Sequence, residues 1–179
     1  MRVLRLQTAD LTREQAQQVR SLCERAWAAK PGDFDDEDWE SCLGGTHVLV
    51  EDRDAFVAHA AVIERTLELD GTPLRTGFVE AVATEPERQG AGLASEAMRA
   101  VNELIDAGFE LGALDTDIPG FYERLGWVVW PGRTAVREPG GVRLTPEEDG
   151  NVLVRRPGRA LEAGRDSLLV CDWRPGDPW

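Results

Sequence analysis

Hydrophobic positions recur at helical spacing in two stretches of the chain. In the first, apolar residues from Val19 to Trp27 fall on one face, and Thr12 and Gln15 before them have the spacing of a capping box. In the second, residues 93–107 carry an apolar stripe, and Gly108 follows them. We therefore expect an amphipathic helix in each stretch.

Elsewhere the apolar positions alternate or fall in short runs, as strands do. They predict strands at Val3–Gln7, His47–Val50, Phe56–Leu69, Leu74–Thr84, Phe109–Leu114, Trp127–Trp130, Val152–Val154 and Leu168–Trp173. Two short helices are expected, at Asp35–Leu43 and Pro119–Leu125. Between Pro131 and Val152 the chain is rich in proline and glycine, so we expect irregular structure there. No repeat or flexible linker interrupts this order, which predicts one α/β (α+β) domain over residues 1–179.

The length and composition are those of a globular protein. The chain has 179 residues, of which 42% are hydrophobic and 30% are charged. No secretory leader is visible, and no stretch approaches the roughly 18 apolar residues that cross a bilayer. We therefore expect a soluble, cytoplasmic protein that engages no membrane. The net charge of −13 argues against nucleic acid as a partner.

The acidity itself has two explanations. Strong negative charge usually serves solubility, and the carboxylates at Asp35–Asp38 also favour the dipole of the short helix that they open. Alternatively, some of the acidic residues attract a cationic substrate through their long-range field. The composition alone leaves both explanations open.

The cysteines and histidines give no metal-binding pattern. Cys23, Cys42 and Cys171 are widely spaced, and His47 and His59 are the only histidines. Because no cluster has the spacing of metal ligands, we expect no metal site. Buried structural thiols are the favoured interpretation of the cysteines, ahead of a catalytic cysteine.

One loop combines glycines with the start of the second amphipathic helix. After a predicted strand, residues 85–92 read Glu-Pro-Glu-Arg-Gln-Gly-Ala-Gly and lead into the helix. Backbone N–H groups at a helix N-terminus, together with the positive end of its dipole, bind phosphate. Gly90 and Gly92 let the backbone approach a pyrophosphate, and Arg88 adds positive charge. A plain tight turn is the alternative, and the loop matches neither the Walker nor the dinucleotide motif.

This loop and a later segment together resemble the Gcn5-related N-acetyltransferase (GNAT) superfamily. The superfamily's motif is Gln/Arg-x-x-Gly-x-Gly/Ala after a long strand, and residues 87–92 follow it except that Glu87 replaces the usual Gln or Arg. Residues 121–127, Phe-Tyr-Glu-Arg-Leu-Gly-Trp, resemble its Phe-Tyr-x-x-x-Gly-Phe element. The resemblance implies a GNAT fold, a mixed central β-sheet flanked by helices, with splayed central strands that bind acetyl-CoA. The residues that it places at the cofactor are Val82, Ala83, Thr84, Arg88, Gln89, Gly90, Ala91, Gly92 and Leu93.

Nearly the whole chain is similar to one branch of the superfamily, the aminoglycoside 2'-N-acetyltransferases. The similarity rests on segments such as Gly32-Asp33-Phe34, residues 59–63 (His-Ala-Ala-Val-Ile), Val79–Ala83 and the ending Gly176–Trp179. In that branch, carboxylates hold the ammonium and hydroxyl groups of the antibiotic. The positions that correspond here are Asp33, Asp38, Glu80, Ala81, Asp115, Glu148, Asp177 and Trp179 with its terminal carboxylate. Asp115 replaces a family serine and Ala81 a family glycine, so these two positions bear on specificity.

The resemblance also implies catalytic roles for three residues. Glu80 would act as the base that removes a proton from the amine, through a water. The backbone N–H of Val82 would polarise the thioester carbonyl, and Tyr122 would protonate the thiolate of coenzyme A. The plain alternatives are a solvated carboxylate on a strand for Glu80 and a core aromatic residue for Tyr122.

Two other functions are kept open. One is acetylation of another polyamine or amino sugar, which the changes at Asp115 and Ala81 allow. The other is a non-catalytic module that binds acyl-CoA while Glu80 and Tyr122 stay idle. Expected partners are therefore acetyl-CoA and an aminoglycoside or similar polycationic amino sugar, and an exposed strand with several tryptophans is compatible with a homodimer.

Overall fold

The structure is a computed structural model that describes residues 1–28, 34–156 and 162–179. The described chain forms two compact units. The first comprises residues 1–63 and 79–103, and the second comprises residues 64–78 and 104–179. Whether the chain acts as a single domain stays a prediction.

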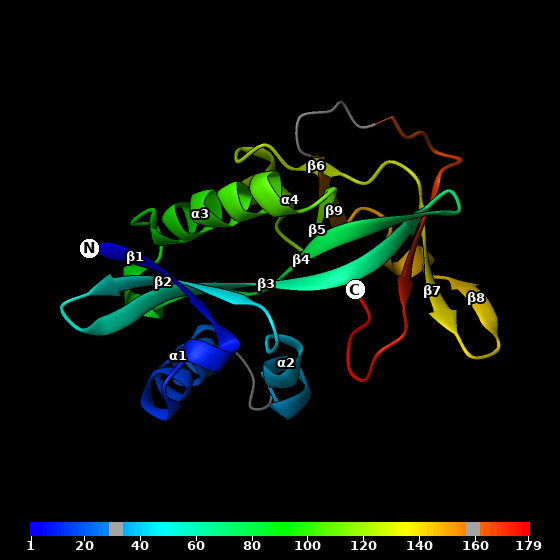
Figure 1. The fold of residues 1–179 in the computed structure, drawn as a ribbon. Helices are drawn as coiled ribbons and strands as arrows, with labels where there is room; N and C mark the ends of the chain where they lie inside the picture. The colour runs from blue at the N-terminus through cyan, green and yellow to red at the C-terminus, as the bar shows by residue number, and fades with distance from the viewer. Residues whose placement is uncertain (29–33, 157–161) are drawn as a thin grey trace. The chain divides into compact units, whose positions relative to one another are not determined.

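The first unit contains the N-terminal helices and the glycine loop. Its elements are β1 (Arg2–Gln7), α1 (Arg13–Ala26), α2 (Asp36–Ser41), β2 (Thr46–Asp52), part of β3 (Ala55–Leu69), the end of β4 (Thr72–Thr84) and most of α3 (Leu93–Gly108), with 3-10 turns at Thr8–Asp10 and Pro86–Arg88. Antiparallel pairing joins β1 to β2 and β2 to β3. Figure 1 shows α1 and α2 on one side of these strands and α3 on the other.

Helix α1 forms where its capping signal predicts. The Thr12 hydroxyl accepts the N–H of Gln15, and the Gln15 side chain accepts the N–H of Thr12, which confirms the capping box. The buried face of α1, made by Val19, Leu22 and Cys23, packs against strand residues that include Leu49, Phe56 and Ala83. This packing backs the end of β4, from which the glycine loop begins.

The second unit holds the remaining strands. Its elements are the turn-side halves of β3 and β4, the end of α3, β5 (Leu111–Asp115), α4 (Pro119–Glu123), β6 (Val128–Val129), β7 (Arg133–Glu138), β8 (Gly141–Leu144), a 3-10 turn at Pro146–Glu148, β9 (Val152–Arg155) and β10 (Leu168–Asp172). Strand β5 is parallel to β4 and antiparallel to β9, whereas β10 is antiparallel to β3 and parallel to β7. These mixed directions confirm the predicted α/β class with a mixed sheet.

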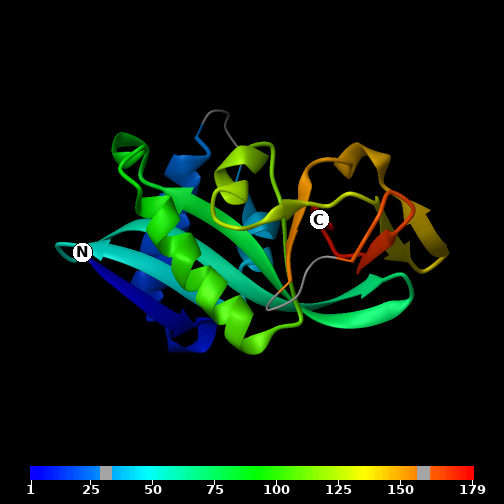
Figure 2. The same ribbon diagram turned by 90° about the horizontal axis from the view of Figure 1, so that it is seen from above.

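The core of the second unit includes the last residue of the chain. Phe78, Leu111 and Trp130 are buried in one cluster with Trp179, which is 3% exposed. Figure 2 shows the C-terminal segment in red, and its last residue packs in this cluster. The side chain of Trp179 is therefore anchored by packing.

One prediction about this unit is wrong. The segment after Pro131 was expected to be irregular, but β7 and β8 form an antiparallel hairpin there. The one proline and two glycines of this hairpin, Pro139, Gly140 and Gly141, lie where β7 turns into β8, and Gly141 has a φ of +130° that suits glycine. The strand residues Thr134–Val136 are buried because β7 also pairs with β10, a long-range contact that local sequence does not show.

Candidate active site

The glycine loop is held at its start by contacts within the first unit. The N–H of Glu85 donates to the carbonyl oxygen of Val57 at 3.0 Å, and the Glu85 carboxylate binds Arg25 in a bidentate ion pair with a closest N···O distance of 2.7 Å. This ion pair lowers the pKa of Glu85. The end of β4 is thereby tied to β3 and to α1.

Gly90 and Gly92 both have left-handed backbones, with φ of +77° and +82°. A Cβ at either position would meet no described atom within 4 Å, so the space above the loop is open. Helix α3 begins directly after Gly92, and the N–H groups of a first helical turn have no partner inside the helix. This geometry fits a phosphate-containing ligand.

Arg88 was expected to add positive charge to this loop for the phosphate, and an ion pair reduces that contribution. Its guanidinium makes an ion pair with Asp52 at 2.7 Å, and this contact lowers the pKa of the Asp52 carboxyl. Its charge is therefore shared with Asp52, so it offers a ligand less attraction than an unpaired arginine. The neighbouring Gln89 and Ala91 are exposed, whereas Leu93 is buried and anchors α3.

Three expected site residues follow one another just before the loop. Glu80, Ala81 and Val82 are all half-buried on β4. Ala81 has a φ of +48°, a left-handed conformation that interrupts the extended strand and favours glycine. This observation explains in physical terms why a glycine is usual at that position in the family.

Asp38 lies in the first turn of α2. Its Oδ2 accepts the N–H of Asp35 at 2.9 Å, while the Asp35 carboxylate accepts the N–H groups of Glu37 and Asp38. Capping therefore accounts for one oxygen of Asp38. Asp33, which was also expected to contact substrate, lies outside the described residues.

Three carboxylates lie within one another's electric field in the second unit. Burial, followed by the charge of Asp177, raises the pKa of Asp115 to about 6. Burial, followed by the charges of Asp115 and Asp177, raises the pKa of Glu148 to about 7. Like charges disfavour one another's ionisation, so the cluster is short of positive charge. We call Asp115, Glu148 and Asp177 the carboxylate cluster.

Two buried polar atoms of this unit have no hydrogen-bond partner among the described residues. They are Oδ1 of Asp115, an acceptor, and Nε1 of Trp179, a donor. An unsatisfied buried polar group costs about 1–3 kcal/mol, so such groups commonly mark a place where another molecule binds.

The C-terminal tail is positioned by two arginines that sequence reasoning missed. Arg65 donates to the carbonyl oxygen of Pro178 at 2.7 Å, and Arg174 donates to that of Asp177 at 2.6 Å. Both guanidinium groups lie over the ring of Phe78, with centroid distances of 4.5 and 5.7 Å. The side chain of Asp177 accepts the N–H of Trp179 at 3.1 Å, which fixes the last turn.

Tyr122 lies on α4 and is 6% exposed. Burial raises its pKa to about 12, a hydrogen bond with the Thr116 side chain lowers it, and the charges of Asp117 and Asp115 raise it. Its hydroxyl is therefore protonated at neutral pH and can donate a hydrogen bond. The ring also packs against Phe121 edge-on, at a centroid distance of 4.8 Å.

The predicted site residues thus divide between the units. Asp38, Glu80, Ala81 and the cofactor residues Val82–Leu93 belong to the first unit. The second unit brings the carboxylate cluster together, and Tyr122 lies within the electric field of its member Asp115. Sequence reasoning gave no role to Arg65, Arg174 or the two histidines, although His59 and Arg174 lie in segments, residues 59–63 and 171–179, that carried the family resemblance.

The cysteines are buried, as predicted. Each of Cys23, Cys42 and Cys171 carries a thiol, and burial raises the pKa of Cys23 to about 12 and that of Cys171 to about 11. Thiols with such pKa values are weak nucleophiles at neutral pH. Among the described residues, no group of three His, Cys, Asp or Glu side chains could hold a metal ion, and no helix is long and apolar enough to span a membrane.

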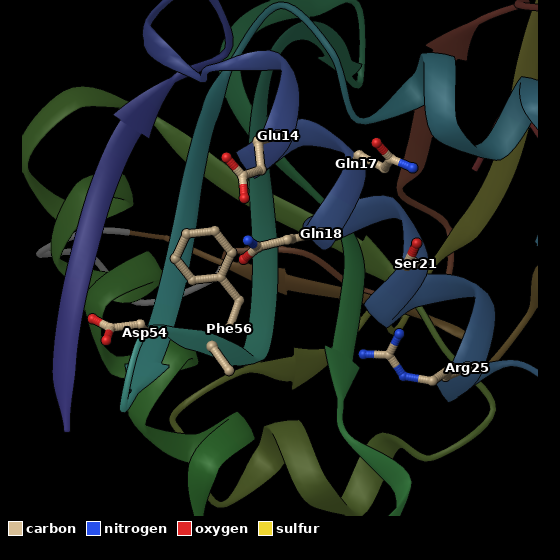
Figure 3. A pocket seen from close by; sticks show the side chains of 8 residues that line it. Glu14, Gln17, Gln18, Ser21, Arg25, Asp54 and Phe56 are labelled. Atoms are coloured by element: carbon tan, nitrogen blue, oxygen red, sulfur yellow. The ribbon is translucent and has the colours of Figure 1, made fainter.

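A separate pocket of about 450 Å³ lies in the first unit, along α1 and the start of β3. Figure 3 shows its polar lining, in which Arg25 and Asp54 flank the ring of Phe56. The other lining residues are Glu14, Gln17, Gln18, Ser21 and Ala55. It includes none of the predicted site residues and is therefore distinct from the candidate site.

Comparison with known proteins shows the family to which the chain belongs. Residues 7–130 match the family model described as acetyltransferase (GNAT) domain, and the chain belongs to this family. It is an N-acetyltransferase that uses acetyl-CoA, which sets aside the alternative of a non-catalytic module.

Among characterised proteins, the chain is similar to the aminoglycoside 2'-N-acetyltransferase of Mycolicibacterium fortuitum. The two are 40% identical over 176 residues, which cover 96% of this chain and 89% of that protein. Two solved structures share the fold at 17% identity. One is a GNAT family N-acetyltransferase (YhbS) from Escherichia coli in complex with CoA, with a TM-score of 0.63 over 96% of this chain and 90% of that chain. The other is a GNAT family acetyltransferase from Brucella melitensis in complex with acetyl-CoA, with a TM-score of 0.60 over 93% of this chain and 94% of that chain.

Proposed function

We propose that this enzyme transfers the acetyl group of acetyl-CoA to the 2'-amine of aminoglycosides and so confers resistance to them. The observation that carries the proposal is the carboxylate cluster, in which burial, followed by the charges of the neighbouring carboxylates, raises the pKa values of Asp115 and Glu148. An aminoglycoside brings several ammonium groups, which would lower those pKa values and relieve the repulsion. The 40% identity to an aminoglycoside 2'-N-acetyltransferase supports the same acceptor.

Acceptor binding draws on the acidic residues predicted from the sequence. In this proposal Asp115, Glu148 and Asp177 pair with ammonium groups, and the terminal carboxylate of Trp179 assists them. Asp33, Asp38 and Glu80 add contacts, and Ala81 shapes the space beside the acceptor. The net charge of −13 increases the rate of encounter with a polycation.

Acetyl-CoA supplies the acetyl thioester when it is bound. The open glycine loop favours binding of its pyrophosphate by backbone N–H groups of Gln89, Gly90, Ala91, Gly92 and Leu93. The backbone of Val82, Ala83 and Thr84 would pair with its pantetheine arm, and Arg88 would lie at the edge of the site.

Three groups then handle charge and protons. Glu80, through a water, accepts a proton from the ammonium so that the neutral amine can form the new C–N bond. The N–H of Val82 donates to the thioester oxygen as negative charge develops there, an interaction worth about 2.7–4 kcal/mol in comparable enzymes. Tyr122 would donate a hydrogen bond and then its proton to the sulfur as the C–S bond breaks, and the second proton that the nitrogen loses on becoming an amide would restore the tyrosine. A hydroxyl with a pKa of about 12 is held ready in its protonated form.

The test is release of coenzyme A, detected with a thiol reagent, from acetyl-CoA and one acceptor at a time. Tobramycin and gentamicin, which carry a 2'-amine, should be turned over with kcat/KM well above that of spermidine. Spermidine represents the second candidate, another polyamine acceptor, which the extra buried carboxylate oxygen of Asp115 favours. A higher kcat/KM for spermidine than for both antibiotics would contradict the proposed acceptor.

A cytoplasmic location and a homodimer are also part of the proposal. The edge strand β8 is exposed along its whole length, with Val142 and Leu144 each 47% exposed, and Trp173 is 53% exposed. Exposed apolar edges favour pairing with another chain. Light scattering after size exclusion should give twice the chain mass of 19.7 kDa, and the monomer mass would contradict the dimer.

A further inference from the structure

A row of buried polar groups in the first unit takes no part in the mechanism above. Thr8 Oγ1 lies 2.9 Å from His47 Nε2, and His47 Nδ1 lies 2.9 Å from His59 Nε2. His59 Nδ1 lies 2.8 Å from the carbonyl oxygen of Ala81. Both histidines are fully buried, and they are the only ones in the chain. We call these four residues the histidine relay.

The strand register explains why the two rings meet. In the antiparallel pair β2–β3, His47 is opposite Ala61 and His59 is opposite Leu49. The two histidines are therefore diagonal neighbours on one face of the pair, within reach of each other's long side chains. The outer end is fixed by the loop before β2, where the Thr8 hydroxyl accepts the N–H of Gly44 at 2.9 Å.

The donors and acceptors present determine which nitrogen of each histidine donates and which accepts. The carbonyl oxygen of Ala81 can only accept, so Nδ1 of His59 carries the proton and donates to it. Burial lowers the pKa of His59 to about 3 and that of His47 to about 4, so each ring is neutral and holds one proton. Nε2 of His59 must then accept from Nδ1–H of His47, which leaves Nε2 of His47 as an acceptor. The single proton of the Thr8 hydroxyl faces both this nitrogen at 2.9 Å and the carbonyl oxygen of Gly45 at 3.2 Å.

Cys23 does not change this assignment. Its Sγ lies 3.8 Å from Nδ1 of His59, and burial raises the pKa of the thiol to about 12. If the thiol donated to Nδ1, the lone pair of that nitrogen would also face the carbonyl oxygen of Ala81 at 2.8 Å. Two acceptors at that distance repel each other, so Nδ1 carries the proton.

The relay ends on the peptide group that contains the candidate oxyanion donor. The carbonyl of Ala81 and the N–H of Val82 belong to one planar trans peptide and point in opposite directions. Holding the carbonyl therefore fixes the direction of the N–H. Ala81 also needs such support because its φ of +48° is strained by about 1–2 kcal/mol for a residue with a side chain.

We propose that the histidine relay is a positioning device, in which His59 holds the Ala81–Val82 peptide so that the N–H of Val82 points at the thioester oxygen. The inference rests on the role of Val82 under the proposed function, but it does not depend on which amine is acetylated. His59 acts through the peptide and not on the reacting atoms. Donation to the carbonyl also polarises the peptide and strengthens its N–H as a donor.

The first test needs no variant. Long-range ¹H–¹⁵N correlation spectra of the wild-type enzyme report which ring nitrogen of each histidine carries the proton, and two histidines give four nitrogens to assign. The relay predicts that both rings are neutral at neutral pH and protonated on Nδ1. A ring protonated on Nε2, or on both nitrogens, would overturn the relay.

The second test compares two substitutions of His59, by asparagine and by leucine, whose side chains are similar to each other in size and shape. His59→Asn places an amide N–H close to the position of Nδ1, whereas His59→Leu removes the donor. We expect His59→Leu to lower kcat by about tenfold or more through misplacement of the N–H, with acetyl-CoA affinity by calorimetry within about twofold of wild type. His59→Asn should recover most of kcat. Equal kcat values for the two variants would overturn the positioning role.

Failure of this inference and failure of the proposed function give different results. If wild type releases no coenzyme A with any amine tested, the proposed function fails, while the spectra still decide the relay. If wild type is active and the tautomers are wrong, only the relay fails. If His59→Leu does not fold, thermal melting will show it, and the spectra together with the kcat of His59→Asn carry the test. A tenfold or larger loss of kcat in His59→Asn would then count against the inference, since this variant keeps the donor.

Discussion

The histidine relay and the carboxylate cluster are two polar regions with opposite chemistry. The two histidine rings are fully buried, whereas Asp115 and Glu148 are half-buried and Asp177 is exposed. In the relay every ring nitrogen has a partner and both rings are neutral, so the region is complete without a ligand. In the cluster, Oδ1 of Asp115 has no hydrogen-bond partner among the described residues, and two carboxyl pKa values are raised. A satisfied network holds the backbone in place, whereas an unsatisfied cluster gains stability only when a cation arrives.

The largest expected effect is on stability as a function of pH, to which the two regions contribute with opposite signs. The histidine pKa values are lowered on folding, so between about pH 4 and pH 6.5 the unfolded chain binds protons that the folded chain does not. Their contribution to the free energy of unfolding therefore rises with pH across this window. At about 1.4 kcal/mol for each pKa unit, the two histidines together amount to several kcal/mol, on the order of 7.

The carboxyl groups of Asp115 and Glu148 act in the other direction. Their folded pKa values are raised to about 6 and about 7, so the folded chain binds the extra protons and stability falls as pH rises through those values. Urea unfolding between about pH 5 and pH 8 measures both slopes. His59→Asn should make the free energy of unfolding rise less with pH, and Glu148→Gln should make it rise more. The same change of slope in both variants would contradict the comparison.

The next effect concerns Tyr122, beside the cluster. Tyr122→Phe keeps the ring packed against Phe121 but removes the only proton donor proposed for the thiolate. We expect kcat to fall by about tenfold to a hundredfold, in the range of a general acid, while the affinity for acetyl-CoA is unchanged. Steady-state kinetics and calorimetry measure the two quantities. An unchanged kcat would leave Tyr122 as a core aromatic.

The tail tests whether the cluster binds the acceptor. Asp177→Asn removes one charge and leaves the Trp179 side chain in the core, so KM for an aminoglycoside should rise by roughly tenfold and KM for acetyl-CoA should not. Deletion of Trp179 is a poorer test because it also empties part of the core. Addition of one glycine after Trp179 moves the terminal carboxylate while keeping the indole, and it should raise the same KM. Equal changes in both KM values would make the tail structural.

A smaller effect is expected on the pH dependence of acceptor binding. Asp115 and Glu148 gain their negative charge as pH rises past about 6 and about 7, so KM for a polycation should fall severalfold between about pH 5.5 and pH 7.5. Glu148→Gln should flatten this profile, and KM for acetyl-CoA serves as the internal control. A KM for the polycation that rises with pH over this range would contradict the ionic role of the cluster.

The smallest expected effect is that of Ala81→Gly in the relay region. Glycine relieves the strain of the left-handed backbone at Ala81 but increases the entropy of the unfolded chain, so the free energy of unfolding should change by less than about 1 kcal/mol. The His59 hydrogen bond to the main-chain carbonyl is kept, and kcat should stay close to wild type. A loss of several kcal/mol would show that the Ala81 methyl group, and not the backbone, stabilises this turn.

The sequence predicts well what short segments encode. The capping box at Thr12 and Gln15 depends on contacts three residues apart, and the order of strand, glycine loop and helix is set by local turn chemistry. The relay could not be read in this way, because its members are 39, 12 and 22 residues apart along the chain. The hairpin β7–β8 was missed for a similar reason, since its burial comes from pairing with the distant β10.

The site residues show the same division. Glycines with special backbones and acidic residues in matched motifs were predicted by type, but the pKa values of the cluster depend on distances that only the fold sets. Arg65 carries no signal in the sequence beyond its charge, and Arg174 is marked only by its place in the C-terminal segment that resembles the family. They hold the tail through carbonyl groups, which any sequence of the same length provides.

The most direct test of the central claim compares kanamycin B with kanamycin A, which differ only in bearing an amine or a hydroxyl group at the 2' position. The enzyme should release coenzyme A with kanamycin B, and two-dimensional NMR of the product should place one acetyl group on the 2' nitrogen. With kanamycin A, release should not exceed the rate without acceptor. Equal turnover of both compounds, or an acetyl group on another nitrogen, would contradict the account.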